Sequence, residues 1–224
     1  MATIGVLTSG ISHEINNPLN FIHGGITLLE KYVNENLQSH QKDIMPLVDI
    51  IVEGVVRVTN IIQTLDQFSR ETDSYTNTCD VNSIINNCLF MLKQRFVDRV
   101  IVKTNYSEHL PPIRGNEGRL HQMFFNILFN ADQSIESKGE ISITTKVEES
   151  NVQIVIADSG CGIRKELISK ITDPFFTTKE PGEGVGLGLS LVYAIVKEHR
   201  GHISFESEEQ QGTTVMLSLP IRCQ

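Results

Sequence analysis

The 224-residue chain lacks several features that define other classes of protein. It has no apolar run near the roughly 18 residues that a membrane-spanning helix needs, and it has no recognisable signal peptide. It also lacks an excess of basic residues, since 19 Lys and Arg stand against 27 Asp and Glu, for a net charge of -8. We therefore expect no membrane segment in the chain and no nucleic-acid binding through a broad basic surface.

Cysteine is scarce, and its spacing does not suggest a metal or redox centre. Scattered thiols fit a reducing compartment, so we expect them to be inert and the chain to be cytoplasmic. The four positions, none of which fits a zinc or redox motif, are Cys79, Cys88, Cys161 and Cys223.

Two common nucleotide-binding signatures are also missing. The chain has no GxxxxGK phosphate loop followed by Ser or Thr, and its glycines do not have the spacing of the dinucleotide-binding fingerprint. A phosphate site in this chain would have to be built in another way.

The first 65 residues carry a helical hydrophobic pattern. Between Ile44 and Leu65, apolar residues recur at alternating steps of four and three, which is a heptad seam. A stretch upstream keeps steps near 3.6, and the polar residues Asn34 to Asp43 predict a turn between two helices. Because a lone hairpin cannot bury both seams, we predict that two chains pair into a four-helix bundle. The alternative is a hairpin packed against the second domain of its own chain.

The pattern changes near residue 75. The polar, aperiodic stretch Arg70 to Thr78 predicts a linker, which divides the chain into a helical hairpin at 1–74 and a second domain at 75–224. Asp80 is placed to cap the first helix of this domain. Strands and helices then mix without regular alternation, so the expected class is α+β. Further helices are predicted at 118–135 and 187–199, and strands at 100–106, 140–147, 152–157, 201–207 and 213–219.

One histidine lies in the run Ser-His-Glu-Ile-Asn-Asn-Pro-Leu of the N-terminal helix. His13 is off the apolar seam and is expected to face solvent, where a neutral imidazole is a competent nucleophile. Glu14 could accept its proton, and Asn17 shares its helix face. Pro18 removes a backbone hydrogen bond and should bend the helix. An exposed histidine by itself is more often without function, so the interpretation depends on the whole string.

The predicted helix 118–135 carries an apolar stripe and a separate polar stripe. Asn126, Asn130 and Gln133 form the polar stripe, at spacings of four and three. Amide oxygens suit Mg²⁺, which prefers oxygen ligands and keeps several waters. A solvated helix face is the commoner reason for such a stripe.

A glycine-rich region follows the strand that ends at Asp158. This residue opens Asp-Ser-Gly-Cys-Gly, and a carboxylate suits the exocyclic amine of adenine because it only accepts hydrogen bonds. Gly160 and Gly162 permit close approach of the backbone to a flat base, although Asp-Ser-Gly alone is a common turn. A second glycine run precedes helix 187–199, where a mobile lid would offer backbone amides to phosphates. The residues of interest there are Lys179, Gly184, Gly186, Leu187 and Gly188.

In this order, the blocks and the closing Gly-Thr-Thr turn at 212–214 resemble the catalytic core of a bacterial two-component sensor histidine kinase. The resemblance covers essentially the whole chain, and the Pro-Phe-Phe-Thr-Thr-Lys string at 174–179 is similar to one subgroup. It implies a histidine-phosphotransfer hairpin that dimerises, followed by an α/β-sandwich domain that binds ATP and Mg²⁺.

The resemblance implies roles for individual residues. His13 would be phosphorylated, with Glu14 as its general base and Asn17 as a helper in phosphotransfer or in a phosphatase reaction. Asn130 would be the Mg²⁺ ligand, and Asp158 would contact adenine. Further nucleotide contacts would be Asn126, Gln133, Gly160, Gly162, Lys179, Gly184, Gly186, Leu187, Gly188 and Thr213.

The resemblance also implies partners. The phosphoryl group would pass to an aspartate of a response-regulator receiver domain, and the kinase would act as a homodimer. Because the acceptor box begins close to Met1, we expect no sensor domain before it. Two alternatives stay open, an excised core or a truncated protein, and we expect the chain to be cytoplasmic, either by itself or as the cytoplasmic part of a larger sensor.

Two departures from the family pattern concern the lid. Val185 stands where Thr or Ser is usual, and Glu183 adds an acid near the expected phosphates, so we expect tuned affinity with activity retained. Phe175 and Phe176 are expected to pack the base of the lid.

Two other functions stay open at this point. The ATP fold resembles that of DNA gyrase, MutL and a heat-shock chaperone, in which hydrolysis drives conformational change. The chain could also be a dimeric scaffold that binds nucleotide only as a structural element.

Overall fold

The computed structural model describes residues 19, 21–22, 24–37, 40–42, 44–52, 54–55, 77–179 and 185–221. The chain divides into two compact units, Met1–Glu71 and Thr72–Gln224. The predicted boundary between residues 74 and 75 lies outside the described residues. So do four of the predicted site residues, which are His13, Glu14, Asn17 and Gly184.

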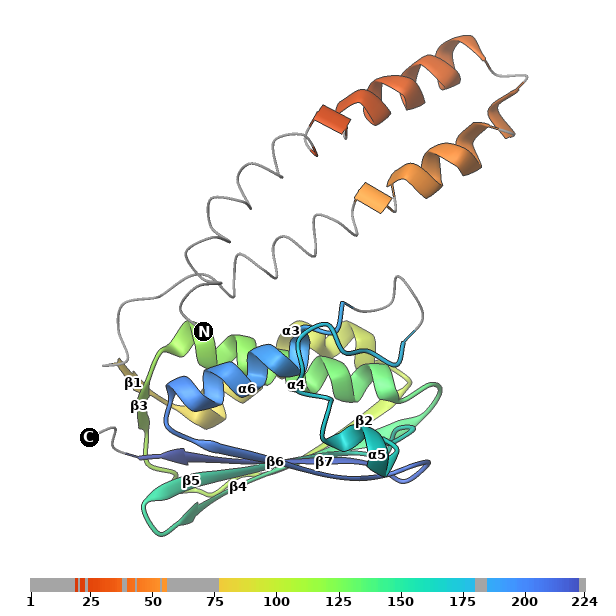
Figure 1. Cartoon of the computed structure of the whole chain (residues 1–224). Helices are drawn as coiled ribbons and strands as arrows, with labels where there is room; N and C mark the ends of the chain where they lie inside the picture. The colour runs from red at the N-terminus through yellow and green to blue at the C-terminus, as the bar shows by residue number, and fades with distance from the viewer. Residues whose placement is uncertain are drawn as a thin grey trace. The chain divides into compact units, whose positions relative to one another are not determined.

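In the first unit, the described residues form the predicted helical hairpin (Figure 1). Residues 24–36 and 44–52 are helical, and Gln41 Nε2 donates to Asn34 Oδ1 at 2.8 Å beside the turn. The first helix continues three residues, 34–36, into the stretch predicted as a turn, because isolated polar residues at a helix end do not stop helical hydrogen bonding.

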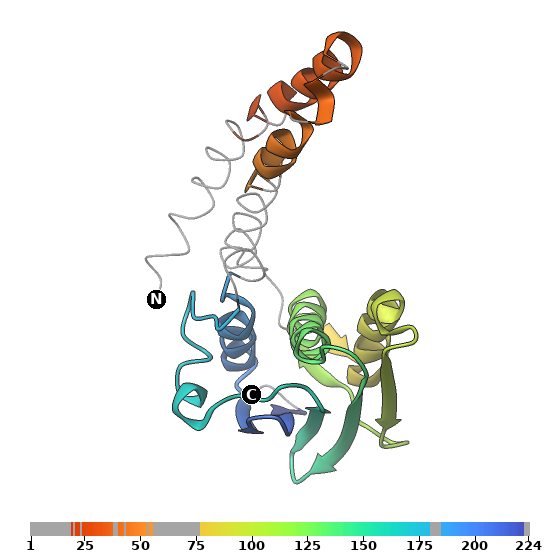
Figure 2. The ribbon, with the colours of Figure 1, turned by 90° about the vertical axis from the view of Figure 1, so that its right-hand side faces the viewer.

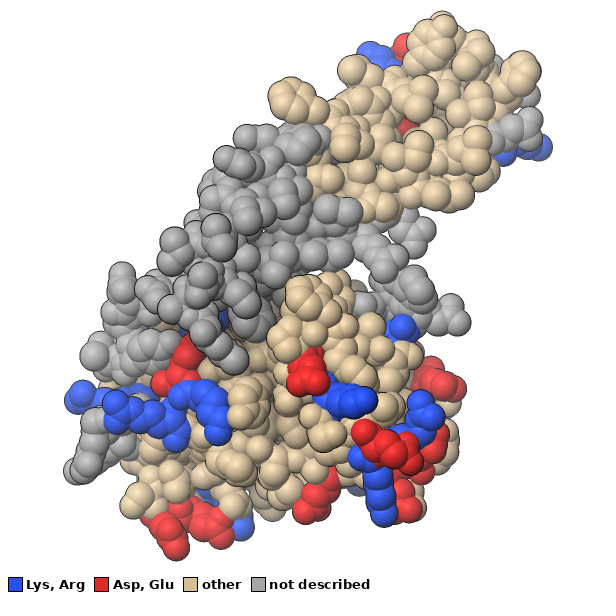
Figure 3. Space-filling view, viewed as in Figure 1, with Lys and Arg blue, Asp and Glu red and all other residues tan. Residues whose placement is uncertain are grey.

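The two helices bury only part of their apolar side chains. Val33 and Val48, one from each predicted seam, are 0% and 1% exposed. Figure 3 shows few charged side chains on the visible face of these helices. An apolar surface of this kind is typical of a site of association with another polypeptide. Its largest members, which are between 61% and 83% exposed, are Phe21, Leu28, Leu47 and Ile50.

The described residues of the second unit form four helices and seven strands. In chain order these are β1 (Asn77–Cys79), α3 (Val81–Phe96), β2 (Val100–Asn105), β3 (Ile113–Gly115), α4 (Glu117–Ser134), β4 (Gly139–Glu148), β5 (Asn151–Asp158), α5 (Lys165–Ile168), α6 (Gly188–Glu198), β6 (His202–Glu208) and β7 (Gly212–Pro220).

These elements form the predicted two-layer α/β sandwich. A five-stranded sheet has the order β2-β4-β5-β7-β6, in which β2 and β4 are parallel and the other neighbours are antiparallel. Helices α3, α4 and α6 cover one face of it (Figures 1 and 2). The α+β class is therefore confirmed, and β4, β5 and β7 alternate buried with half-buried residues as a sheet covered on one face requires.

The two helices that begin the second unit follow the predicted patterns closely. Asp80 caps α3, since its Oδ1 accepts from the Ser83 backbone N at 3.1 Å. Asn116 caps α4 in the same way, through the Arg119 backbone N at 3.1 Å. The apolar stripe of α4 packs into the core with every member at most 4% exposed, namely Leu120, Phe124, Ile127, Ala131 and Ile135.

The predicted linker is wrong at its C-terminal end. Asn77 and Thr78 belong to β1, which pairs antiparallel with β3 in a separate two-stranded sheet. Neither β3 nor the four-residue helix α5 was predicted. Elements this short carry no periodic signal, and β1 is fixed by a partner more than 30 residues away in the sequence.

Two polar contacts fasten α6 to α4. Arg119 and Glu198 form a bidentate ion pair, with Nη2 to Oε1 at 2.6 Å and Nε to Oε2 at 3.1 Å. The buried His199 ring accepts from the Asn116 backbone N through Nε2 at 3.0 Å, and its Nδ1 lies 2.8 Å from the Ile195 carbonyl. Burial lowers the pKa of His199, which keeps the ring neutral. The start of α4 and the end of α6 therefore meet in one fixed arrangement.

Candidate functional site

Asp158 stands at the end of β5 and is the best-supported polar group of the site. Its Oδ1 accepts three hydrogen bonds: from Ser134 Oγ at 3.0 Å, from the Gly160 backbone N at 2.8 Å and from the Thr213 backbone N at 3.3 Å. All three donors converge on one oxygen. Within the described residues, none donates to Oδ2, so this second oxygen is available to a ligand.

The electrostatics of Asp158 reflect two opposing effects. Burial raises the pKa of its carboxyl, while hydrogen bonds from Gly160, Ser134 and Thr213 act in the other direction by stabilising the charged form. The side chain is half-buried, so it is partly shielded from water and still reachable. Such a carboxylate can accept a hydrogen bond from an amine in a partly dry environment.

Ser134, in the last turn of α4, was not predicted as a site residue. Its hydroxyl has both Asp158 Oδ1 and the Ala131 carbonyl within reach, at 3.0 and 2.8 Å. The sequence did hold a signal, because residues 126, 130 and 134 are spaced by four and lie on one helix face. The polar stripe of this helix therefore extends to Ser134.

Gly160 is required by the position of Ser134. A Cβ at residue 160 would lie 2.0 Å from Ser134 Oγ and 2.7 Å from its carbonyl carbon, which is closer than atoms can approach. The Cys161 backbone N also donates to the Ser134 carbonyl at 2.9 Å. The Asp-Ser-Gly-Cys-Gly loop therefore lies directly on the end of α4.

The structure brings the two predicted asparagines to the start of α6. Measured from the position that a Cβ on Gly188 would take, Asn126 Oδ1 lies 3.7 Å away, and Asn130 Nδ2 and Oδ1 lie 3.6 and 3.9 Å away. Gly188 is the first residue of α6, whose N-terminal amides have no partner within the helix. Neutral amide groups and a helix N-terminus therefore face the same space, which favours an anionic ligand there.

Gln133 and Lys179 also meet. Lys179 Nζ donates to Gln133 Oε1 at 2.5 Å, which joins the segment before the predicted lid to the end of α4. Thr213 and Gly160 both contact Asp158 through their backbone N atoms. Leu187 is the N-cap residue of α6. The Leu187 side chain is 3% exposed, so this residue can offer a ligand only its backbone.

The segment before α6 differs in part from expectation. The Phe175 side chain is 61% exposed, so the prediction that it packs the base of the lid is wrong. The backbone does this packing, because Gly186 has a φ of +72° and a Cβ there would lie 2.5 Å from backbone atoms of Phe175 and Phe176. Both the φ value and the space require glycine at this position.

The described residues contain no group of three or more His, Cys, Asp or Glu side chains that could hold a metal ion. A metal in this site would therefore depend on amide oxygens and on the ligand itself. Two of the cysteines are buried, and burial raises the pKa of the Cys88 thiol to about 11, so Cys88 is unreactive at neutral pH. Cys161 is exposed.

Comparison with known proteins assigns both units. Residues 4–74 match the model of the His Kinase A (phospho-acceptor) domain, and residues 115–222 match that of the histidine kinase-, DNA gyrase B- and HSP90-like ATPases. AtoS of Escherichia coli K12, a signal transduction histidine-protein kinase, is 35% identical over 226 aligned residues, which cover all of this chain. The chain has the catalytic core of a two-component histidine kinase.

Solved structures agree with the fold of this histidine kinase core. Full-length ShkA in complex with AMPPNP gives a TM-score of 0.75 at 22% identity, over 96% of this chain and 46% of ShkA. ThkA in complex with the response regulator TrrA gives 0.66 at 24% identity, over 98% of this chain and 62% of ThkA. At these identities the two structures support the fold alone.

The chain spans about a third of the length of AtoS, since the alignment covers 36% of that protein. None of the helices among the described residues has the length and apolar character that crossing a membrane requires. The subgroup indicated by residues 174–179 stays a prediction.

Proposed function

We propose that the chain is an ATP-dependent protein-histidine kinase that phosphorylates itself on His13. The observation that carries the nucleotide half of this proposal is Asp158, whose Oδ1 accepts from three donors while no described residue donates to Oδ2. This arrangement orients one carboxylate oxygen for a hydrogen bond from the exocyclic amine of adenine. Family membership supports the acceptor half, since the phospho-acceptor domain match covers His13.

The base of the nucleotide would lie against the loop after Asp158. Gly160 and Gly162 let this loop pack closely on the protein, since a Cβ at Gly160 would meet Ser134 and one at Gly162 would lie 2.0 Å from the Glu208 carbonyl oxygen. Thr213 holds Asp158 from β7 through its backbone N. A polar site that fixes one hydrogen bond to the base discriminates against bases that lack the donor, because the carboxylate would then be left without a partner. We therefore expect a preference for adenine over guanine.

The residues near Gly188 fit Mg²⁺ with a nucleotide. Asn130 would supply one amide oxygen, and Asn126 stands beside it. Oxygen ligation by one or two protein groups, with the remainder from phosphates and water, is the usual form of a Mg²⁺–nucleotide site. When bound, the ion would neutralise charge on the phosphates. Gln133, Lys179 and the amides of Gly184, Gly186, Leu187 and Gly188 are proposed as further contacts.

The acceptor residues take their roles from the family. His13 would attack the terminal phosphate, Glu14 would accept the imidazole proton, and Asn17 would assist phosphotransfer or hydrolysis of the phosphorylated partner. The next acceptor would be an aspartate of a response-regulator receiver domain. Pairing of two chains through the exposed apolar residues of the hairpin would form the homodimer, and we place the protein in the cytoplasm.

Incubation with ATP labelled at the γ-phosphate tests the function. We expect acid-labile label on the protein, because a phosphohistidine hydrolyses in acid, and loss of that label in His13→Gln. Label that persists in His13→Gln would contradict the assignment of the acceptor. Phosphate release without labelled protein would indicate an ATPase, and bound nucleotide without either reaction would indicate a scaffold.

The metal assignment has its own test, in binding alone. EDTA should weaken ATP binding to the unchanged protein and should have little further effect on Asn130→Ala, because that variant has already lost the ligand. Adenosine, which carries no phosphate, should bind both proteins equally. An unchanged response of Asn130→Ala to EDTA would exclude Asn130 as the ligand.

A further inference from the structure

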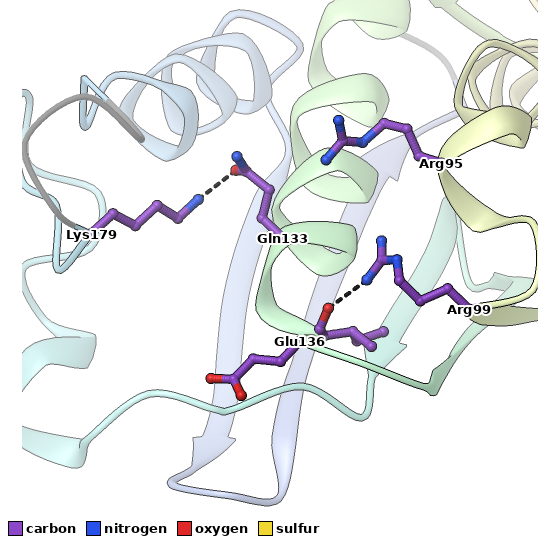
Figure 4. A pocket seen from close by; sticks show the side chains of 6 residues that line it. Arg95, Arg99, Gln133, Glu136 and Lys179 are labelled. Carbon is purple, nitrogen blue, oxygen red and sulfur yellow. Dashed lines mark hydrogen bonds between the residues drawn. The ribbon is translucent and has the colours of Figure 1, made fainter.

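Three of the six residues that line a pocket at the end of α4 are cationic. Figure 4 shows Lys179 on one side of α4, Arg95 and Arg99 on the other side, and Gln133 between them. Ile135 and Glu136 complete the lining. Three cations therefore gather in one place in a chain whose net charge is -8.

The two arginines are anchored by one buried carboxylate. Asp132 is 0% exposed, and its Oδ2 accepts from Arg95 Nε at 2.7 Å while its Oδ1 accepts from Arg99 Nη2. A fully buried carboxylate is stable only with such partners. With Asp132 and Glu136 counted against three cations, the pocket keeps one positive charge in excess.

The Arg99 guanidinium makes structural contacts through both of its Nη groups. Its Nη1 donates to the carbonyls of Ile135 and Asp132, at 2.5 and 3.3 Å, and so closes the C-terminal end of α4. This helix has no basic residue of its own in the last turn, so Arg99 supplies the cation that a helix C-terminus favours.

Arg95 has donors to spare. Only its Nε is used by Asp132, its guanidinium carbon lies 4.9 Å from the centre of the Phe129 ring, and its side chain is 50% exposed. Among the described residues, neither Nη group has a hydrogen-bond acceptor. A guanidinium that is fixed at Nε by a carboxylate and on one face by an aromatic ring presents its outer edge in a set direction.

The pocket adjoins the nucleotide site. Gln133 lines the pocket, whereas the next residue, Ser134, bonds Asp158. Consecutive helix residues project about 100° apart, so one turn of α4 serves both sites. Lys179, which donates to Gln133, connects them at the surface.

We propose that this pocket binds a phosphate group, held by Arg95 from α3 and by Lys179. Arginine pairs with phosphate oxygens through two parallel hydrogen bonds, and a lysine ammonium adds a point charge. The phosphate is either the terminal group of a bound nucleotide, a case that rests on the function proposed above, or a separate phosphate anion.

Arg95→Gln is the informative variant. It removes the outer donors of the pocket but leaves Asp132 paired with Arg99, so the fold is expected to persist. Lys93→Gln is the matched control, since it removes one positive charge from an exposed position on the same helix that does not line the pocket. Binding of ATP, adenosine and inorganic phosphate would be measured by calorimetry on both variants, with thermal unfolding as a check.

Two outcomes support the pocket and distinguish its ligand. For a nucleotide phosphate, Arg95→Gln should weaken ATP binding about tenfold at low salt, with adenosine unchanged and a smaller effect at high salt. For a separate anion, Arg95→Gln should lose inorganic phosphate binding while ATP binding stays the same.

The proposal is overturned if Arg95→Gln binds both ATP and phosphate as Lys93→Gln does. Failure of the proposed function would look different, because the unchanged protein would then bind neither ATP nor adenosine, whereas the phosphate measurement would still test the pocket.

Discussion

Ser134 Oγ lies 3.0 Å from Asp158 Oδ1, and this contact joins the last turn of α4 to the end of β5. It connects the helix that carries Asn126 and Asn130 to the carboxylate proposed to contact adenine. Two further features fix Ser134 at the end of the sheet. The absence of a side chain at Gly160 leaves room for Ser134, and the Cys161 backbone N donates a hydrogen bond to the Ser134 carbonyl. The two halves of the proposed nucleotide site are therefore held in register by one serine.

Ser134→Ala should weaken ATP binding by about three- to tenfold, the loss expected for one hydrogen bond of ordinary strength. The hydroxyl stabilises the ionised form of Asp158, so its removal should raise the pKa of that carboxyl further. Affinity in the variant should then begin to fall at a higher pH than in the unchanged protein. Calorimetric titrations between pH 5 and 8 would measure both effects, and Ser137→Ala, an exposed position just beyond α4, should behave like the unchanged protein.

Gly160→Ala should reduce both stability and ATP binding, because the new Cβ would meet Ser134 at 2.0 Å and its carbonyl carbon at 2.7 Å. Forced overpacking of this kind costs ~1–3 kcal/mol. Urea unfolding would report the loss. The control is Gly118→Ala in the first turn of α4, where the nearest atom would be 3.5 Å away and the helix should be slightly stabilised. Equal stability of the two variants would contradict the close approach at Gly160.

The buried His199 predicts how stability depends on pH. Because burial lowers its pKa, the unfolded chain binds a proton more readily than the folded chain. Its contribution to stability is therefore complete above about pH 6.5, the ordinary histidine value, and is lost as the pH falls below it. The slope for one proton is at most about 1.4 kcal/mol per pH unit. Urea midpoints measured from pH 5 to 8 should show this decline, and His199→Gln should have a flatter profile over the same range.

Glu198→Gln should destabilise the contact between α6 and α4. Arg119 is only 9% exposed at its side chain, so loss of the carboxylate leaves a poorly solvated guanidinium with weaker partners, at a cost of ~1–3 kcal/mol. Glu140→Gln is the comparison, since Lys103 and Glu140 are 64% and 39% exposed and such pairs contribute ~0–1 kcal/mol. Thermal unfolding of the two variants should separate a structural ion pair from a surface one. A smaller effect for Glu198→Gln than for Glu140→Gln would show that the buried pair does not fasten the helices.

The sequence by itself determined the helices and strands that have a periodic apolar pattern, and it determined the order and spacing of the short motifs of the site. The apolar stripe of α4 and the Asp80 cap could be read directly, because both depend on residues within one or two helical turns. The same holds for Asn126 and Asn130 on one helix face, and for Asp158 at the end of an alternating strand. The resemblance to the family depends on these local features alone.

The tertiary structure alone decided which of these residues meet. Ser134 and Asp158 are 24 positions apart, and Arg95 and Asp132 are 37 apart, so no local pattern could pair them. Strand β1 likewise exists only through β3, and three residues are too few for a periodic signal. Side-chain chemistry limits what each residue can bind, but the packing of α3, α4 and the sheet decides which donors converge on one carboxylate. The two aspartates differ for this reason. Asp158 accepts three hydrogen bonds on one oxygen and keeps the other for a ligand, whereas Asp132 is buried and pairs with two arginines.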